Sequence, residues 1–151
     1  MTPTADIAGP MTREQVTEYL TEATIPVRIA CYRPEAGLWI VSLWEEYETG
    51  QLSCATGVES ALAGFLRADE QVAVEVSENH PPYRGVRGSG TASLRPDEDK
   101  QLLRSLLERH LGGTDSDLAA TLLDPSREEV RIDIDLEDGY TWDFSDRMAE
   151  G

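Results

Sequence analysis

The sequence predicts a mainly β fold with a few helices, a small antiparallel β-barrel of six to seven strands. Three observations support this prediction. Apolar and polar residues alternate with a period of two in one segment after another, as in half-buried strands. Two-residue turn signals connect some of these segments, and short amphipathic helical patterns interrupt them. About seven antiparallel strands with a few packed helices fit a barrel, because closure removes exposed strand edges.

The N-terminal part of the chain predicts a tail, a helix and two strands. Residues 1–11 are expected to be a flexible N-terminal tail. Thr12 begins a helix with a capping-box pattern, and this helix is expected to end before Pro26. The odd positions of residues 25–32 are apolar, which predicts a strand with one buried face. Residues 38–43 are apolar almost throughout, which is typical of a strand covered on both sides.

Three further strands follow in the middle of the chain. Residues 51–55 are expected to return as the hairpin partner of the strand before them. Residues 71–76 and 86–94 both alternate with a period of two. Gly88 and Gly90 fall on the inner side of the second of these strands. A glycine there leaves space for a closely approaching backbone or for a ligand.

Helices and a last hairpin complete the predicted elements. Apolar residues at helical spacing predict three helices, over residues 58–66, 102–111 and 118–123. Near the C-terminus, residues 130–136 alternate apolar and charged side chains. Asp138 and Gly139 then match a two-residue turn, and residues 140–144 are apolar at alternate positions. This pattern predicts a β-hairpin.

Composition limits the classes of function. The 151 residues include 29 Asp and Glu but only 13 Lys and Arg, which gives a formal charge of −16. A phosphate backbone would repel this charge, so a nucleic acid is not an expected partner. No apolar run approaches the ~20 residues of a membrane span, and the N-terminus lacks the regions of a signal peptide. We therefore expect a soluble cytoplasmic protein with one domain over residues 12–151.

The kind of charge is also informative. Lys100 is the single lysine, and the other cations are arginines. Abundant carboxylates with almost no lysine resemble proteins of salt-loving cytoplasms, where multimolar salt screens self-repulsion. An ordinary acidic protein is the alternative. In the halophilic interpretation, acidic clusters reflect the solvent, and Asp133 and Asp135, which alternate with isoleucines, are expected on a solvated face.

Cysteine and histidine usage favours neither a metal site nor a nucleophilic triad. Cys31 and Cys54 both lie in apolar strand-like runs, so we expect reduced core residues. The chain shows no Cys/His metal spacing and no Ser/His/Asp order. His80 is expected in a solvated loop. His110 falls near the end of a predicted helix, where the helix dipole explains a histidine sufficiently.

A helix, a long strand pair, "LSCAT", a second helix, "VAVEV" and "PPYRGVRGSGTASL" follow one another in this chain. This order resembles the pyridoxamine 5′-phosphate oxidase-like family of FMN-binding split barrels, from about Thr12 to Phe144. Its most specific stretches are 41–44, 55–56 and 83–90. The resemblance implies a six-stranded antiparallel split β-barrel and a homodimer with two FMN sites in clefts between the subunits. Some relatives hold a deazaflavin instead, and the reduced ring passes a hydride.

The resemblance also implies which residues contact the cofactor. They are Ser42, Leu43 and Trp44 beside the ring edge; Thr56, Gly57 and Ser60 at the phosphate; Arg84 and Arg87 flanking the cleft; and Trp142, presented to the partner's flavin. Hydroxyls, free helix amides and cations are the groups that a phosphate needs. Trp44 and Trp142 have a second interpretation as core or interface aromatics. Arg87 has one as a strand cation paired with a carboxylate.

The phosphate pattern departs from that of the relatives. Ala61 and Leu62 stand where adjacent cations are expected, and Glu59 adds a negative charge beside them. Glu45 would place a further carboxylate at the cleft. Each missing charge-assisted bond removes about 1.5–3 kcal/mol of interaction, so weaker FMN binding is expected.

Three functional hypotheses follow from the sequence. The first is an FMN-dependent oxidoreductase acting on a small organic substrate. The second is a dimeric split-barrel binding module that has lost tight flavin binding, and the third is a deazaflavin-dependent reductase. All three share one fold, so the fold cannot decide between them. The sequence assigns neither catalytic residues nor a substrate.

Overall fold

The computed structural model describes residues 6–48 and 50–149. Its strands are β1 (Asp6–Ala8), β2 (Val27–Arg33), β3 (Gly37–Leu43), β4 (Glu46–Glu48), β5 (Gln51–Gly57), β6 (Gln71–Ser77), β7 (Arg84–Pro96) and β8 (Glu129–Asp143). Its helices are α1 (Arg13–Glu22), α2 (Ala61–Ala68), the 3-10 turn η1 (Glu98–Lys100), α3 (Gln101–Leu111), α4 (Asp117–Leu122) and α5 (Ser145–Ala149).

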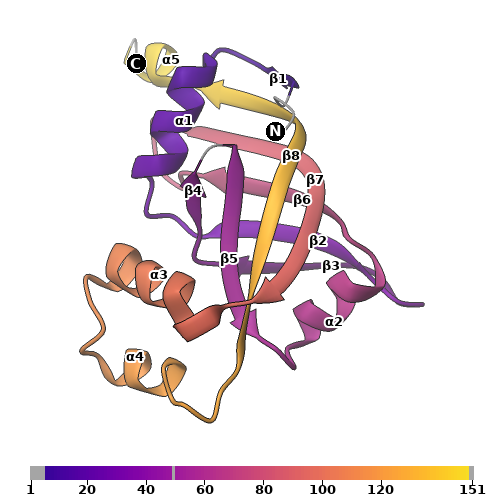
Figure 1. The fold of residues 1–151 in the computed structure, drawn as a ribbon. Coiled ribbons are helices and arrows are strands. Elements are labelled where there is room, and N and C mark those ends of the chain that lie inside the picture. Colours follow the sequence, from indigo (N-terminus) through magenta and orange to yellow (C-terminus); the bar gives the residue numbers. More distant parts are fainter. Residues whose placement is uncertain (1–5, 49, 150–151) are drawn as a thin grey trace.

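The strands form one strongly curved sheet in the order β3-β2-β6-β7-β8-β5-β4, with antiparallel pairing along this path. β3 and β4 end the path and do not pair with each other. The sheet therefore curls into a barrel that stays open along one seam (Figure 1). This arrangement confirms the predicted antiparallel split β-barrel with peripheral helices.

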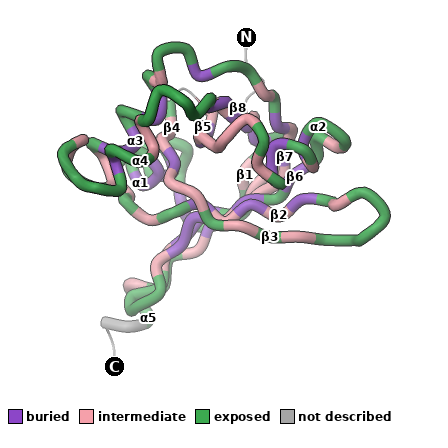
Figure 2. Tube along the Cα trace, turned by 90° about the horizontal axis from the view of Figure 1, so that it is seen from below, coloured by how far each residue is buried: buried purple, intermediate pink, exposed green. Residues whose placement is uncertain are grey.

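Alternating side chains fill the barrel. Ile29, Leu52, Ile132 and Ile134 are almost completely buried, and Leu20 of α1 joins them. Figure 2 shows the buried residues on the inner strands, and exposed residues on the helices and on the projecting β2–β3 hairpin. None of the helices in the described residues is both long enough and apolar enough to cross a membrane.

The helices cover the two ends of the barrel. α1 begins at Thr12 with the predicted capping box, in which Gln15 and Thr12 bond each other's backbone amides. α2 lies at the opposite end and buries Leu62 and Leu66. α3 and α4 lie side by side next to the end of β5 (Figure 1), where Leu107 and other apolar residues form a second small core.

The predicted C-terminal hairpin is wrong. Asp138 and Gly139 lie inside β8, which runs without a turn and pairs with β7 along its length. The register shifts between Ser89 and Gly90, so β8 has a bulge where the turn was expected. The long β7 pairs with both halves of the segment, and this pairing leaves no role for a turn.

Gly88 and Gly90 of β7 leave space for the backbone of β8. This was one of the two predicted alternatives, the other being space for a ligand. A Cβ at Gly88 would lie 2.3 Å from the Asp138 carbonyl oxygen, and one at Gly90 would lie 2.3 Å from that of Asp135. Both distances are far below a van der Waals contact. Glycine is therefore required where β8 bends across β7.

Part of the expected N-terminal tail is ordered. Residues 6–8 form β1, which pairs in parallel with β8 through Asp6↔Asp138. Met11 is buried, and its backbone N–H donates to Thr141 Oγ1 at 3.1 Å. The prediction of a flexible tail over residues 1–11 is therefore wrong from residue 6 onwards, while residues 1–5 lie outside the described part of the chain.

Buried polar positions test two further predictions. Cys31 and Cys54 are both free and buried, as expected. The prediction that Asp133 lies on a solvated face is wrong. This residue is only 5% exposed and accepts hydrogen bonds from Ser53, Arg95 and Arg131. The alternation correctly predicted that the Asp133 carboxylate points away from the apolar core. Arg95 and Arg131 cover it there, so it is not exposed to solvent.

Candidate functional site

A cleft of about 320 Å³ opens between the C-terminal ends of β3 and β5. α3 and α4 form its apolar wall, and the loop before β8 forms its polar side. Its lining residues are Pro26, Ser42, Leu43, Trp44, Ala55, Thr56, Gly57, Leu103, Leu106, Leu122, Arg127 and Glu129. The site therefore combines segments from the whole chain on one rigid frame.

The cleft brings together more than half of the predicted cofactor contacts, namely Ser42, Leu43, Trp44, Thr56 and Gly57. Ser60 lies beside them, because the Thr56 hydroxyl donates to Ser60 Oγ at 2.9 Å. Ser60 also caps α2 by accepting from the Ala63 amide. These residues meet because β5 runs directly into the capped start of α2.

Arg84, Arg87 and Trp142 lie away from this cleft within the subunit. Arg84 lines a second cleft beside α1, where it pairs with Glu78 at 3.0 Å. Arg87 stacks on two aromatic rings, with its guanidinium 5.1 Å from the Tyr140 centroid and 5.6 Å from that of Trp142. One chain alone does not gather these side chains around a ligand in the β3–β5 cleft.

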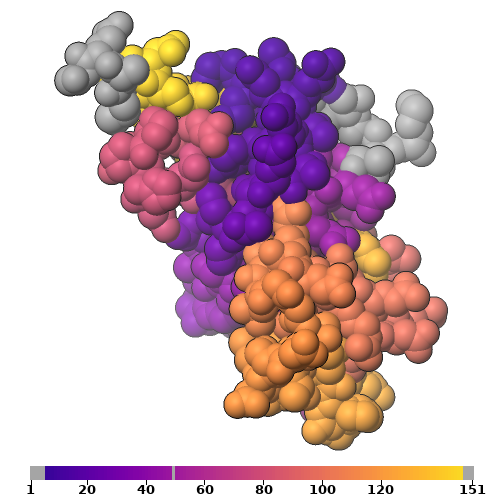
Figure 3. Space-filling model, turned by 90° about the vertical axis from the view of Figure 1, so that its left-hand side faces the viewer, coloured from indigo at the N-terminus to yellow at the C-terminus, as the bar shows by residue number. Residues whose placement is uncertain are grey.

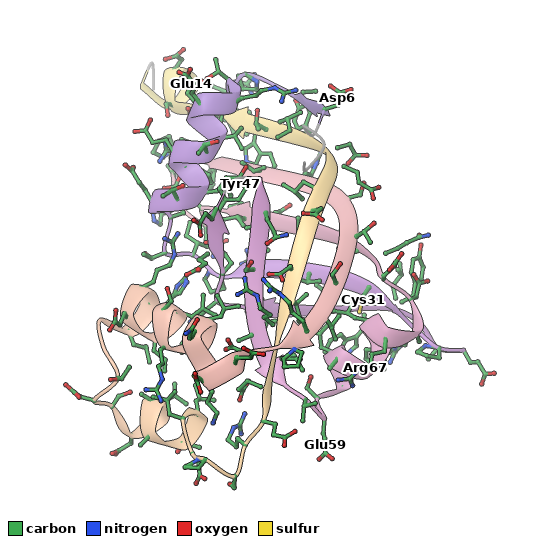
Figure 4. The ribbon with its side chains drawn as sticks, in the orientation of Figure 1. Asp6, Glu14, Cys31, Tyr47, Glu59 and Arg67 are labelled. Atoms are coloured by element: carbon green, nitrogen blue, oxygen red, sulfur yellow. The ribbon has the colours of Figure 1, made fainter. Side chains whose placement is uncertain are left out.

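The positions of the missing cations have different environments. Leu62 is 3% exposed and packs into the barrel core, whereas Ala61 is exposed at the start of α2. Glu59 points away from the barrel at the tip of the β5–α2 connection (Figure 4). Neither Ala61 nor Leu62 supplies charge to the cleft, and Leu62 contributes to stability instead.

Arg127 is a cation of the cleft that sequence reasoning missed. It comes from the connection between α4 and β8, and its Nη2 lies 3.9 Å from where a Cβ at Gly57 would stand. The Asp124 turn holds this connection, since the Arg127 N–H donates to the Asp124 carbonyl and Lys100 Nζ donates to the same oxygen at 2.6 Å. In the sequence, Arg127 beside Glu128 looks like an ordinary charged loop, so no local signal marked it.

Trp44 lines the cleft, and a second ring packs against it. His110 stacks on it with ring planes 10° apart and centroids 5.8 Å apart. The His110 ring nitrogen Nε2 bonds the Glu45 backbone carbonyl at 2.9 Å, and burial lowers the pKa of His110. The His110 ring therefore packs against Trp44, a contact that the helix-end interpretation of His110 did not predict. Glu45 itself is fully buried and is absent from the cleft lining, contrary to the expected placement.

A shallower cleft of about 510 Å³ lies on the outer face of β2, β6, β7 and β8. Arg28 and Arg87 line it together with Tyr140 and Ile40. Ile40 is 65% exposed and the nearby Leu38 is 69% exposed, so the edge of this face presents unusually large apolar side chains to solvent.

Comparison with known proteins finds relatives only by structure, since no family model and no curated protein sequence matches the chain. An F420 reductase has 20% identity and a TM-score of 0.68, with 81% of this chain and 94% of that chain covered. A provisionally assigned pyridoxamine 5′-phosphate oxidase from Listeria innocua has 16% identity and a TM-score of 0.64, with 87% and 97% covered. The chain has the split-barrel fold of the pyridoxamine 5′-phosphate oxidase-like proteins.

A conserved hypothetical protein from Mycobacterium tuberculosis has the same fold, with a TM-score of 0.72, 20% identity, and coverage of 95% of this chain and 90% of that chain. The split barrel therefore spans nearly the whole chain. The likeness concerns the fold, and a shared fold does not fix the chemistry of the cleft.

Proposed function

We propose that the chain is an oxidoreductase that holds a flavin or deazaflavin ring, with FMN as the first candidate, in the β3–β5 cleft. Its substrate would be a small organic molecule. The observation that carries this proposal is the meeting of Ser42, Leu43, Trp44, Thr56 and Gly57 in one cleft. A structural neighbour that is an F420 reductase supports the deazaflavin alternative.

The residues present fit a flat heterocycle. The volume lies at the lower end of the range for small-molecule sites, and apolar walls with a few polar groups are typical of them. β3 pairs only with β2 among the described strands, so the other edge of this strand is open at Ser42 and Leu43. When bound, the ring would supply hydride transfer, while the chain positions it and excludes water.

We further propose that the protein works as a homodimer through the face that carries Leu38 and Ile40. Both side chains are largely exposed beside the outer cleft, and an apolar face of this kind suits a self-complementary interface. A partner would then supply Trp142 to the cofactor cleft, as the resemblance implies. Sedimentation equilibrium tests this, with Leu38→Glu expected to give monomers and Leu118→Glu, at an exposed leucine of α4, expected to leave dimers.

Titration of FMN into the protein at high salt tests the cofactor proposal. Flavin fluorescence should be quenched with saturation at micromolar concentrations, and a deazaflavin should be titrated in parallel. Thr56→Ala with Ser60→Ala should weaken binding, because the double variant removes the hydroxyl pair at the end of β5 and the start of α2. Arg67→Ala removes an exposed cation of α2 outside the cleft and should leave binding unchanged.

A binding module without tight flavin affinity is the second candidate. The burial of Leu62 favours it, because the position that should hold a cation has become part of the core. If FMN and deazaflavin fluorescence both stay unquenched when the cofactor is titrated to about 100 micromolar, the result would contradict the cofactor proposal and support the binding module.

A further inference from the structure

The charged groups of the β3–β5 cleft already neutralise each other. Arg127 and Glu129 are the charged side chains among its lining residues in the described part of the chain. The Arg127 guanidinium lies 3.4 Å from Glu129 Oε1. The Glu129 side chain is only 3% exposed, whereas that of Arg127 is 42% exposed. The carboxylate is therefore a fixed part of the cleft wall, and the arginine is its partner.

The other polar groups of the cleft are neutral. Ser42 and Thr56 line the cleft with hydroxyls, and the Thr56 hydroxyl donates to that of Ser60 beside the cleft. α2 begins with Ala61 and Leu62, so no cation stands at its first turn. A ligand tail here would meet neutral donors, one paired cation and one buried carboxylate.

This balance discriminates between tails of different charge. A phosphomonoester carries about −1.5 to −2 at pH 7. It would be attracted by the exposed side of the Arg127 guanidinium and repelled by the Glu129 carboxylate. The apolar wall of the cleft, which includes Leu103 and Leu106, strengthens this repulsion. An uncharged tail meets no such repulsion, and a single negative charge can be balanced by the one guanidinium.

We propose that Glu129 is a specificity-determining residue that makes the cleft select ring cofactors with an uncharged or singly charged tail over those ending in a phosphomonoester. This inference rests on the proposed cofactor site and changes the order of its candidates, because it places FMN behind cofactors with the same ring and a less charged tail. Arg127 is the group that a singly charged tail contacts, and Glu129 limits how much further negative charge the cleft accepts.

Three flavins with the same ring test the inference: riboflavin, riboflavin 4′,5′-cyclic phosphate and FMN. They carry no charge, one charge and a phosphomonoester on the tail. Quenching of ring fluorescence gives each dissociation constant without any enzymatic assay. The wild-type protein should bind riboflavin and the cyclic phosphate at least as tightly as FMN.

Glu129→Gln should tighten FMN binding by about tenfold while leaving riboflavin binding unchanged, because the carboxylate repels the phosphomonoester and riboflavin has no charge to repel. Glu128→Gln is the matched control, since it removes the same charge from the exposed neighbouring residue and should leave the FMN-to-riboflavin ratio unchanged. Arg127→Gln should weaken binding of the cyclic phosphate and leave binding of riboflavin unchanged. Thermal melting confirms that each variant is folded.

Wild-type binding of FMN tenfold or more tighter than riboflavin would overturn this inference and leave the cofactor site standing. An unchanged FMN-to-riboflavin ratio in folded Glu129→Gln would overturn it as well. Failure of all three flavins to bind would overturn the cofactor site and this inference together.

Discussion

The guanidinium of Arg109 on α3 lies 3.4 Å from the fully buried carboxylate of Glu45. The same guanidinium donates to the backbone carbonyls of Leu20, Thr21 and Ala23 at the C-terminal end of α1. In the space-filling view of Figure 3, α1 lies directly above the α3–α4 segment. One arginine of α3 therefore ties this helix to the C-terminal end of α1.

Glu45 should make stability fall as the pH rises. Burial raises its pKa from an ordinary value of 4.5 to about 7, and the Arg109 charge opposes this only in part. The folded state therefore holds the proton more tightly than the unfolded chain. The stability that this adds below pH 4.5 is lost as the pH rises through 7.

Denaturant unfolding between pH 5 and pH 8 measures this effect. Glu45→Gln should remove up to about 3 kcal/mol of the pH-dependent change in unfolding free energy. Glu48→Gln, at an exposed position of β4, should keep the wild-type slope. Parallel slopes for wild type and Glu45→Gln would contradict the prediction.

Arg109→Met should destabilise the protein by about 1–3 kcal/mol, because it leaves the carbonyls that end α1 and the Glu45 carboxyl without their hydrogen-bond donor. Thermal unfolding checks this, with exposed Arg104→Met on the same helix as the control. The double variant Arg109→Met with Glu45→Met should recover part of the loss. Additive losses in the double variant would argue against a coupled pair.

Asp133 should stabilise the protein at neutral pH. Burial alone would raise its pKa, but hydrogen bonds from Arg131, Ser53 and Arg95 outweigh burial and lower it. The stabilisation is therefore present above the ordinary value of 3.8 and is lost as the pH falls. Asp133→Asn should cost about 2–3 kcal/mol at pH 7 and less at pH 3.5. Asp115→Asn in an exposed loop should change little at either pH.

Two glycine substitutions should have opposite effects on stability. Gly90→Ala puts a Cβ 2.3 Å from the Asp135 carbonyl oxygen and should cost about 1–3 kcal/mol. Gly64→Ala lies in α2 with no atom within 4 Å of the new Cβ, so it should gain about 0.5–1 kcal/mol from helix propensity. Melting temperatures that move in the same direction would contradict this pair.

The sequence predicted the strands of the barrel because period-two alternation is a local consequence of burying one face. It predicted the start of α1 at Thr12 because a capping box needs only neighbouring residues. It was misled at Asp138 and Gly139, where the turn chemistry is local but the pairing partner is not. The long β7 lies more than forty residues earlier in the chain, and it holds this segment extended.

What the sequence alone determined was the alternation, the burial of Cys31 and Cys54 and the absence of cations at 61 and 62. Only the tertiary structure placed Arg127 opposite Gly57, paired it with Glu129, and buried Glu45 against α3. The physical reason is that backbone periodicity acts over a few residues, whereas charge pairing depends on which distant segments meet when the sheet curls.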